Sequence, residues 1–329
     1  MLFYSKKEKN NIIKEDIIFQ ISVEKNIIFI GKMGCCAKFF LGGKKMNYVL
    51  LAVVVLGLTL QQVASKIYGD KVKGGAYSFT LGTILIALLF FVITMKNKFV
   101  FSTEYVGYSV AFGVATCMTL VFTLLALQEG PLSLSTLVTQ YSLLIPTAYG
   151  LLARGEKITW TLLCGVAFLL VSLIFINFEK EGETKKINLK WILYISLAFV
   201  GNGACSTIQA AQQHACNEQF KNEFMIIAYA MSVLVLAIFV IVFERKHCLQ
   251  DLKKGALCAV LRGIGLAVVN FLVMYLTNRM EVSVMFPIIS AGGTLATFLV
   301  AVFVYKEKLS KFQNLGFVLG IISVIFLNI

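Results

Sequence analysis

Polar side chains that interrupt long apolar stretches are the residues of this chain that could carry chemistry. Amide, hydroxyl and guanidinium groups in such surroundings serve either as contacts between helices or as contacts to a bound molecule. Amides and hydroxyls suit a neutral or zwitterionic molecule, and an arginine can bind a carboxylate or phosphate through two parallel hydrogen bonds. As candidate substrate-binding residues we select Gln61, Gln140, Tyr141, Asn202, Gln209, Arg262, Asn270 and Ser290.

Arg262 is the one charged residue clearly inside an apolar stretch, and two interpretations of it stay open. A buried intramembrane charge is costly and marks a functional site by default. The alternative is a side chain that extends along its helix to the nearer membrane surface.

Patterns of catalytic and metal-binding residues are absent from the sequence. His214 and His247 are the only histidines, and the eight cysteines form no CxxC pair. HExxH and GxSxG motifs are missing as well. We therefore expect no catalytic residue, no metal site and no cofactor.

Acidic residues occur only in the N-terminal tail, in connections or at the ends of apolar stretches. Proton-coupled exporters of lipophilic cations need a buried carboxylate that holds the proton and the cation in turn. The distribution therefore favours a neutral, zwitterionic or anionic substrate.

Long apolar stretches position the candidate residues. Hydrophobic residues make up 58% of the 329 residues and charged residues only 14%, whereas soluble proteins carry about 25% charged residues. A hydrocarbon core about 30 Å thick requires roughly 20 helical residues, and backbone in lipid must satisfy its own hydrogen bonds. The sequence predicts an all-α integral membrane protein with ten transmembrane helices, at 47–66, 75–95, 105–126, 131–153, 158–177, 191–212, 224–243, 255–277, 282–304 and 311–328.

The net charge of +13 does not indicate nucleic-acid binding, because lysines and arginines gather in the tail and at helix ends. The lipid bilayer and a small-molecule substrate are the expected partners, and a monomer is compatible with the sequence. Basic residues in the connections do not decide the orientation in the membrane, since the tail nearly evens the two sides.

The first 45 residues are basic and rich in Lys, Ile, Phe and Asn, and they end in Gly-Gly-Lys-Lys before Met46. A bacterial ribosome-binding site translated by mistake reads this way. We interpret segment 1–45 as a mis-assigned start, with synthesis beginning at Met46, and the alternative is a basic tail at the membrane surface. A bacterial plasma membrane is the expected location.

An internal repeat appears when the sequence is shifted by 151 positions. Between positions 156 and 177 there are 7 identities in 22, including Gly165 with Gly316 and Ser172 with Ser323. The predicted domains are two five-helix repeats, 46–178 and 191–329. Because five is odd, the second copy crosses the membrane in the opposite sense. Such inverted repeats are typical of secondary transporters, whose substrate lies between the halves.

Prolines fall in the fourth and ninth predicted helices, which are equivalent in the repeat. A proline inside a helix removes a hydrogen bond and bends the helix. We expect bends at Pro146 and Pro287, where broken helices frame a cavity.

Several motifs resemble the EamA-type proteins of the drug/metabolite transporter superfamily. Residues 155–159 read Gly-Glu-Lys-Ile-Thr and 306–310 read Lys-Glu-Lys-Leu-Ser, while 129–133 read Glu-Gly-Pro-Leu-Ser. Met285-Phe286-Pro287-Ile288 and Gly292-Gly293 add to the resemblance, which covers 47–329. It implies a metabolite transporter with both termini in the cytoplasm, and it does not define the substrate.

Glu156 and Glu307 are expected in the first turn of the fifth and tenth helices, where carboxylates favour the positive end of the helix dipole. Thr159 and Ser310 are expected to cap those helices.

Together these features predict a secondary transporter of a small polar metabolite that works by alternating access. The alternatives are a lipid-carrier flippase or a multidrug efflux protein.

Overall fold

The computed structural model describes residues 43–72, 74–95, 98–129, 138–139, 141–177, 188–217, 219–245, 247–303 and 311–328. Gln140, Glu307 and most of the predicted N-terminal segment lie outside these residues. Internal contacts divide the chain into two units, Met1–Val53 and Val54–Ile329. The helix contacts and side-chain interactions of the candidate site lie within the second unit.

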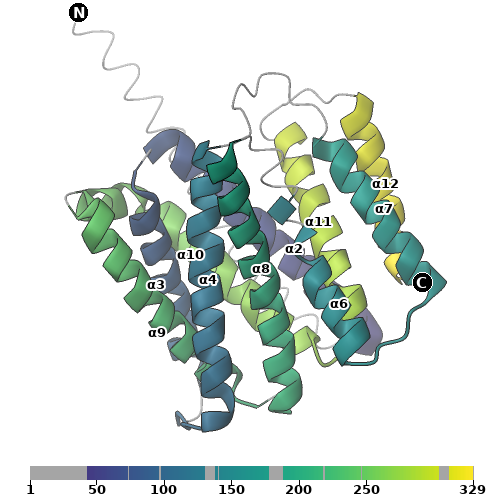
Figure 1. Ribbon diagram of the computed structural model, residues 1–329, viewed down its shortest axis with the longest axis horizontal. Coiled ribbons are helices and arrows are strands. Elements are labelled where there is room, and N and C mark those ends of the chain that lie inside the picture. The colour runs from purple at the N-terminus through teal and green to yellow at the C-terminus, as the bar shows by residue number, and fades with distance from the viewer. Residues whose placement is uncertain are drawn as a thin grey trace, which may run out of the picture. The chain divides into compact units, whose positions relative to one another are not determined.

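All elements of the described residues are helical (Figure 1). The α-helices are α2 (Gly43–Ile67), α3 (Ala76–Thr94), α4 (Thr103–Glu129), α6 (Leu144–Ala153), α7 (Trp160–Asn177), α8 (Leu189–Ala215), α9 (Lys221–Phe239), α10 (Cys248–Leu276), α11 (Val282–Phe303) and α12 (Lys311–Asn328). Two short π-helices, η1 (Tyr68–Val72) and η2 (Val240–Glu244), extend α2 and α9.

Six of the described helices are long and apolar enough to cross a membrane. They contain the segments Met46–Ser65, Ala76–Thr94, Thr103–Thr123, Leu189–Ala215, Lys221–Glu244 and Cys248–Leu276. The helices α6, α7, α11 and α12 include shorter apolar segments. The predicted all-helical class is therefore confirmed, and six candidate membrane spans are present among the described residues.

The fourth predicted helix, 131–153, differs in the structure. A turn at Ser142 and Leu143 precedes α6, which begins at Leu144. Pro146 is therefore the third residue of α6, and the first amides of a helix have no acceptor within it. A proline fits there without loss of a hydrogen bond. Pro146 thus lies at a helix start, whereas Pro287 lies inside α11.

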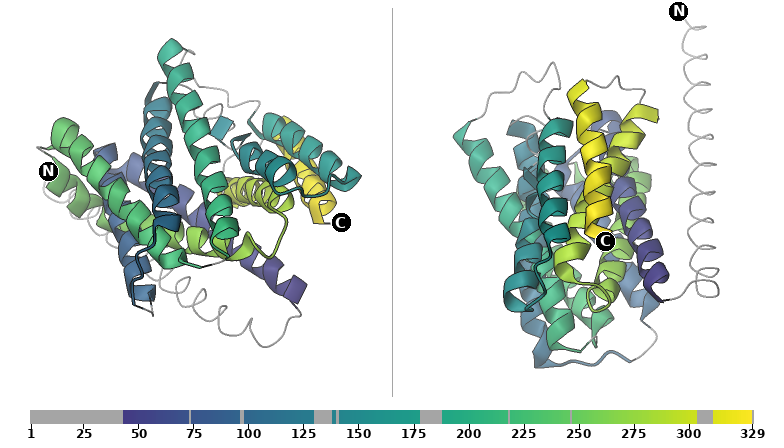
Figure 2. Two further views of the ribbon diagram at one scale, coloured as in Figure 1. Left: turned by 60° about the horizontal axis from the view of Figure 1, so that its bottom comes forward. Right: turned by 90° about the vertical axis from the view of Figure 1, so that its right-hand side faces the viewer.

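Helices of the second unit pack in two sets, visible in Figure 1 and Figure 2. In the first set, α3 contacts α9 and α10, and α4 contacts α8 and α9. In the second set, α7 packs along α12, and α11 contacts α6, α7 and α12. Buried aromatic side chains from α3, α4 and α9, including Phe91, Phe112 and Tyr229, form the core of the first set.

Glycines allow the closest approaches between these helices. A Cβ on Gly263 of α10 would lie 2.7 Å from the carbonyl oxygen of Thr83 on α3. A Cβ on Gly113 of α4 would lie 2.7 Å from the carbonyl oxygen of Ala228 on α9. Small residues at such crossings are typical of helices that associate in membranes, where dispersion contacts drive packing.

Candidate functional site

Tyr141, Pro287 and Ser290 line a narrow pocket between α7, α11 and the segment that leads into α6. Leucines of the same elements complete the wall. The Tyr141 hydroxyl donates a hydrogen bond of 3.0 Å to the carbonyl oxygen of Leu170. In this conformation the pocket is too narrow to hold a water molecule, so a substrate could enter only if the helices moved apart.

Asn202 joins α8 to the turn that precedes α6. Its Nδ2 donates a hydrogen bond of 2.6 Å to the Ser142 hydroxyl and one of 3.4 Å to the carbonyl oxygen of Thr139. The segment that leads into α6 is therefore held from two helices, by Asn202 of α8 and, through the Tyr141 hydroxyl, by the Leu170 carbonyl oxygen of α7.

Gln209 and Asn270 contact each other directly. The Gln209 Nε2 donates a hydrogen bond of 2.6 Å to the Asn270 Oδ1, joining α8 to α10. Asn270 Nδ2 in turn donates to the carbonyl oxygen of Leu266 at 2.8 Å. Two residues selected separately from the sequence thus form one polar pair, in which Gln209 is buried and Asn270 is half-buried.

Gln61 lies on α2 beside α10. Its Nε2 donates to the carbonyl oxygen of Gly57, one turn earlier, at 3.4 Å. A Cβ on Gly265 would meet the Gln61 side chain at 3.0 Å, so the glutamine packs closely on α10. The structure gives Gln61 a contact between helices, and Gln140 lies outside the described residues.

Arg262 is the middle residue of α10, but its guanidinium lies near the start of α3. The guanidinium carbon is 5.2 Å from the ring centroid of Phe79, the fourth residue of α3. Arg262 Nη1 is buried and has no hydrogen-bond partner. A long helical side chain extends toward the N-terminus of its own helix, which explains the position. The pocket residues lie on other helices.

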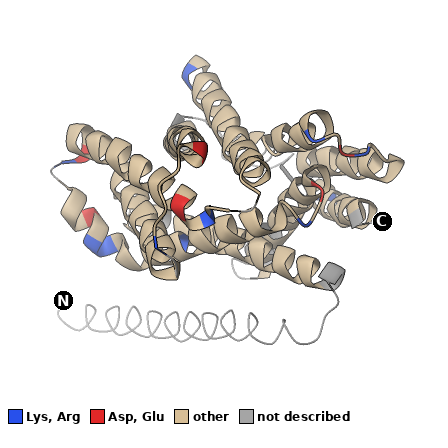
Figure 3. Ribbon diagram, turned by 90° about the horizontal axis from the view of Figure 1, so that it is seen from below, with Lys and Arg blue, Asp and Glu red and all other residues tan. Residues whose placement is uncertain are grey.

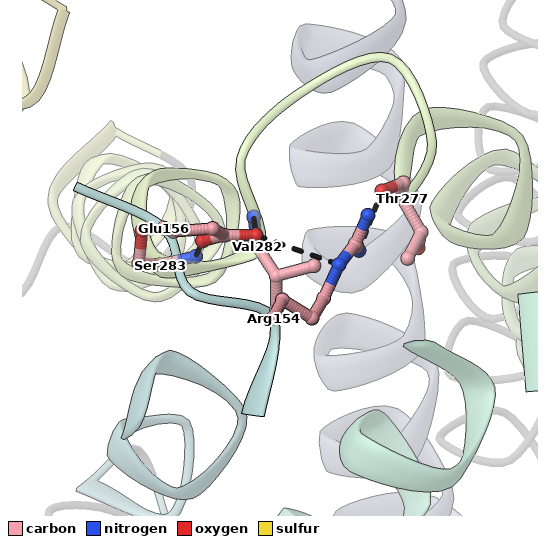
Figure 4. A network of polar contacts seen from close by, with 5 residues as sticks. All are labelled: Arg154, Glu156, Thr277, Val282 and Ser283. Atoms are coloured by element: carbon pink, nitrogen blue, oxygen red, sulfur yellow. Dashed lines mark hydrogen bonds and ion pairs between the residues drawn. The ribbon is translucent and has the colours of Figure 1, made fainter. Parts of the chain in front are cut away.

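A cluster that the sequence did not indicate joins the α6–α7 connection to the α10–α11 connection (Figure 4). Arg154 Nη1 donates a hydrogen bond of 3.0 Å to the carbonyl oxygen of Thr277, the C-cap of α10. Glu156 accepts hydrogen bonds from the backbone amides of Val282 at 2.9 Å and Ser283 at 2.8 Å. Arg154 Nε lies 3.7 Å from Glu156 Oε1. We call Arg154 and Glu156 the clip.

The clip matches the dipoles of the two helices that it contacts. A cation is favourable at the C-terminal end of a helix and a carboxylate at the N-terminal end; Arg154 meets the end of α10 and Glu156 meets the start of α11. Gly155 between them has a φ of 66°, a conformation that glycine adopts without strain. The sequence motif therefore needs this glycine for a structural reason.

The expected position of Glu156 was wrong. α7 begins at Trp160, and Glu156 caps α11, a helix of the other predicted repeat. Tertiary packing brings the two helix ends together, which local sequence cannot reveal. Thr159 does cap its own helix, because its hydroxyl accepts a hydrogen bond of 3.2 Å from the amide of Leu162.

A second carboxylate holds the start of α3. Glu244 accepts hydrogen bonds from the amides of Tyr77 at 3.0 Å and Ser78 at 2.7 Å, and from the Ser78 hydroxyl at 2.7 Å. Asp251 accepts a hydrogen bond of 2.8 Å from the amide of Gly75. The Tyr68 hydroxyl donates a hydrogen bond to the carbonyl oxygen of Gly75. The pKa of Tyr68 is raised, mainly because the side chain is buried and secondly because Asp251 is negatively charged.

Charged residues in the described part of the chain lie mainly at helix ends and in connections (Figure 3). No group of three or more His, Cys, Asp or Glu residues within the described part of the chain is arranged to hold a metal ion.

Residues 189–329 match the model of the EamA-like transporter family. The match confirms the resemblance drawn from the motifs and supports an EamA-type member of the drug/metabolite transporter superfamily. With the apolar helices it indicates a multi-pass membrane protein, and it supports a protein that is not an enzyme, since the family consists of transporters.

No curated protein matches this chain. Among solved structures, 28 chains match. One, a crystal structure described only as that of a protein, has a TM-score of 0.71 at 13% identity and covers 86% of this chain and 96% of that chain. At this identity the similarity shows the fold alone.

Proposed function

We propose that this protein is a secondary transporter of a small polar metabolite, working by alternating access between two inverted five-helix repeats. The observation that carries the proposal is a pair of reciprocal hydrogen bonds between α7 and α12. Ser172 Oγ donates to the carbonyl oxygen of Gly316 at 2.7 Å, and Ser323 Oγ donates to that of Gly165 at 2.7 Å. At the 151-residue offset Ser172 is equivalent to Ser323 and Gly165 to Gly316. The two hydrogen bonds are therefore equivalent, as a twofold axis between the halves requires.

The packing of other helices supports the same symmetry. α3 and α9 are the second helices of the two repeats, and α4 and α10 are the third helices. In each half the second helix packs on the third helix of the other half, so that α3 contacts α10 and α9 contacts α4. The contacts of α3 with α9 and of α7 with α12 join equivalent helices, and residue pairs such as Tyr77 with Phe239 and Phe91 with Tyr229 show that α3 and α9 run antiparallel. Ten transmembrane helices follow if α6, α7, α11 and α12 also cross the membrane.

The polar groups between these helices support a neutral, zwitterionic or anionic substrate. We propose that Tyr141, Ser290, Asn202, Gln209 and Asn270 contribute to its site, with Gln61, Gln140 and Arg262 as further contacts. The acidic residues that the structure describes lie in connections or within about one turn of a helix end, which argues against a buried proton-carrying carboxylate. We propose the bacterial plasma membrane as the location.

The test is a metabolite panel scored by the unfolding temperature of the purified protein, followed by flux in proteoliposomes. A ligand that binds only the folded protein raises this temperature by mass action. We expect at least one polar metabolite to stabilise the protein and to exchange across the bilayer. Stabilisation and flux confined to polyisoprenoid lipids or lipophilic cations would instead support the flippase or the efflux protein. Absence of both effects would contradict the transporter.

A further inference from the structure

We propose that the clip, Arg154 and Glu156, is the gate at one end of the transport path: closed in this conformation, and released when that end opens. The proposal rests on the alternating-access function proposed above. It assigns to these two residues a role in positioning the helices, and it leaves contact with the substrate to others.

The clip connects the two halves of the chain. Arg154 and Glu156 belong to the first predicted repeat, whereas Thr277, Val282 and Ser283 belong to the second. Movement of the halves that separates the α6–α7 connection from the α10–α11 connection must break all three hydrogen bonds. Hydrogen bonds to charged groups are stronger than those between neutral groups, so the clip favours the closed state.

Release of the clip leaves the start of α11 intact. The amides of Val284 and Met285 bond to the carbonyl oxygen of Glu281, at 3.2 Å and 2.9 Å. Only the amides of Val282 and Ser283 depend on Glu156. The clip side chains are partly exposed, 16% for Arg154 and 9% for Glu156, so water can reach them when they separate. The contact can therefore break without unfolding the helix.

The clip acts on the helix that lines the pocket. Ser283 precedes Pro287 by one helical turn and Ser290 by about two turns, at 3.6 residues per turn. Both Pro287 and Ser290 line the narrow pocket. Holding the start of α11 therefore holds this wall of the pocket, and releasing the start allows the wall to move.

Gly150 offers a variant that weakens the clip without changing any charge. A Cβ at this position would lie 2.5 Å from Glu156 Oε2 and 2.9 Å from the amide nitrogen of Ser283. The clash exists only while the clip is closed, so Gly150→Ala should favour the open state. Gly107→Ala is the matched control, because nothing lies within 4 Å of the Cβ that it would add.

The experiment measures which face of the membrane reaches the pocket. A reporter cysteine replaces Leu144, which lines the pocket, in the full-length chain with its native cysteines substituted. A membrane-impermeant maleimide is applied to intact cells and, separately, to inverted membrane vesicles. Glu156→Gln and Gly150→Ala are compared with Glu281→Gln and Gly107→Ala, and unfolding temperatures identify variants that fail to fold.

In Glu156→Gln and Gly150→Ala, labelling of the reporter cysteine should rise by about tenfold from one face of the membrane and fall from the other face. A tenfold rise is the shift expected from losing one or two charge-assisted hydrogen bonds. The two controls should match the parent. Equal labelling of Gly150→Ala and Gly107→Ala from both faces would overturn the gate, as would a rise from both faces. Because labelling needs no substrate, a failure of the gate is distinguishable from a failure of the transport proposal, which the metabolite panel tests.

Discussion

Ser172 on α7 donates a hydrogen bond of 2.7 Å to the carbonyl oxygen of Gly316 on α12. The same bond occurs in reverse, from Ser323 to Gly165, also at 2.7 Å. Two reciprocal bonds fix the helices antiparallel and in register, so that α7 and α12 contact each other through equivalent faces. Both serines are buried, where an interhelical hydroxyl contact replaces one to water.

Replacing either serine by alanine should therefore destabilise the protein by a similar amount. We expect Ser172→Ala and Ser323→Ala each to lower the free energy of unfolding by about 0.6 to 2 kcal/mol, the range of hydrogen bonds between membrane helices. Thermal unfolding in detergent measures this, with half-buried Ser206→Ala on α8 as the control. A loss in one variant and none in the other would contradict the symmetry of this contact.

Gly165→Ala should destabilise the same pair of helices. The added Cβ would lie 2.7 Å from Leu327 Cγ and 3.2 Å from its backbone nitrogen. Overpacking of this kind costs about 1 to 3 kcal/mol. Equilibrium unfolding should show this loss for Gly165→Ala and none for Gly107→Ala, where the Cβ meets open space. Equal stability of the two variants would contradict the close packing of Gly165 on Leu327.

The contributions of Gln209 and Asn270 to the free energy of unfolding should be coupled. Because their side chains are directly bonded at 2.6 Å, Gln209→Leu and Asn270→Leu should show a coupling energy of about 0.5 to 3 kcal/mol in a double-mutant cycle of unfolding. If the pair also contacts the substrate, both single variants should weaken the stabilisation by a ligand from the metabolite panel. Additive effects on unfolding would show that the bond contributes nothing.

Substitution of Arg262 distinguishes a role in substrate binding from a structural role. Its buried Nη1 has no hydrogen-bond partner, and a buried charge without a partner destabilises a fold. Arg262→Gln should therefore leave the unfolding temperature equal or higher, while flux of anionic metabolites in proteoliposomes falls more than flux of neutral ones. Equal losses for both classes of metabolite would indicate a structural arginine, whose packing on Phe79 orders α3 and α10.

Glu244 should contribute more to stability than an exposed glutamate. It accepts three hydrogen bonds at the start of α3, and hydrogen bonds to charged groups contribute about 1.5 to 3 kcal/mol. Glu244→Gln should lower the free energy of unfolding by an amount in this range and speed hydrogen exchange at Tyr77 and Ser78. Glu281→Gln, an exposed change in a connection, should do neither.

Composition and the long apolar stretches of the sequence predicted the membrane class and the approximate helix boundaries, and its short motifs carried the family resemblance. An apolar stretch long enough to cross a bilayer has one stable backbone conformation, so local sequence suffices for these features. The offset of 151 residues also predicted which residues are equivalent, and Ser172 and Ser323 make equivalent contacts. The start of α6 was not predicted, because Pro146 is compatible with both a helix interior and a first turn.

Contacts between distant residues were decided by the tertiary structure. Gln209 and Asn270 were both candidates, but their bond depends on the crossing of α8 and α10. Arg262 lies at the middle of its helix in the sequence, yet packing places its guanidinium beside Phe79 at the start of α3. Glu156 was expected in the first turn of α7 and instead caps α11, because the fold brings the first two amides of α11, those of Val282 and Ser283, within reach of its carboxylate. Sequence sets which groups need partners, and the fold alone decides which partners lie within reach.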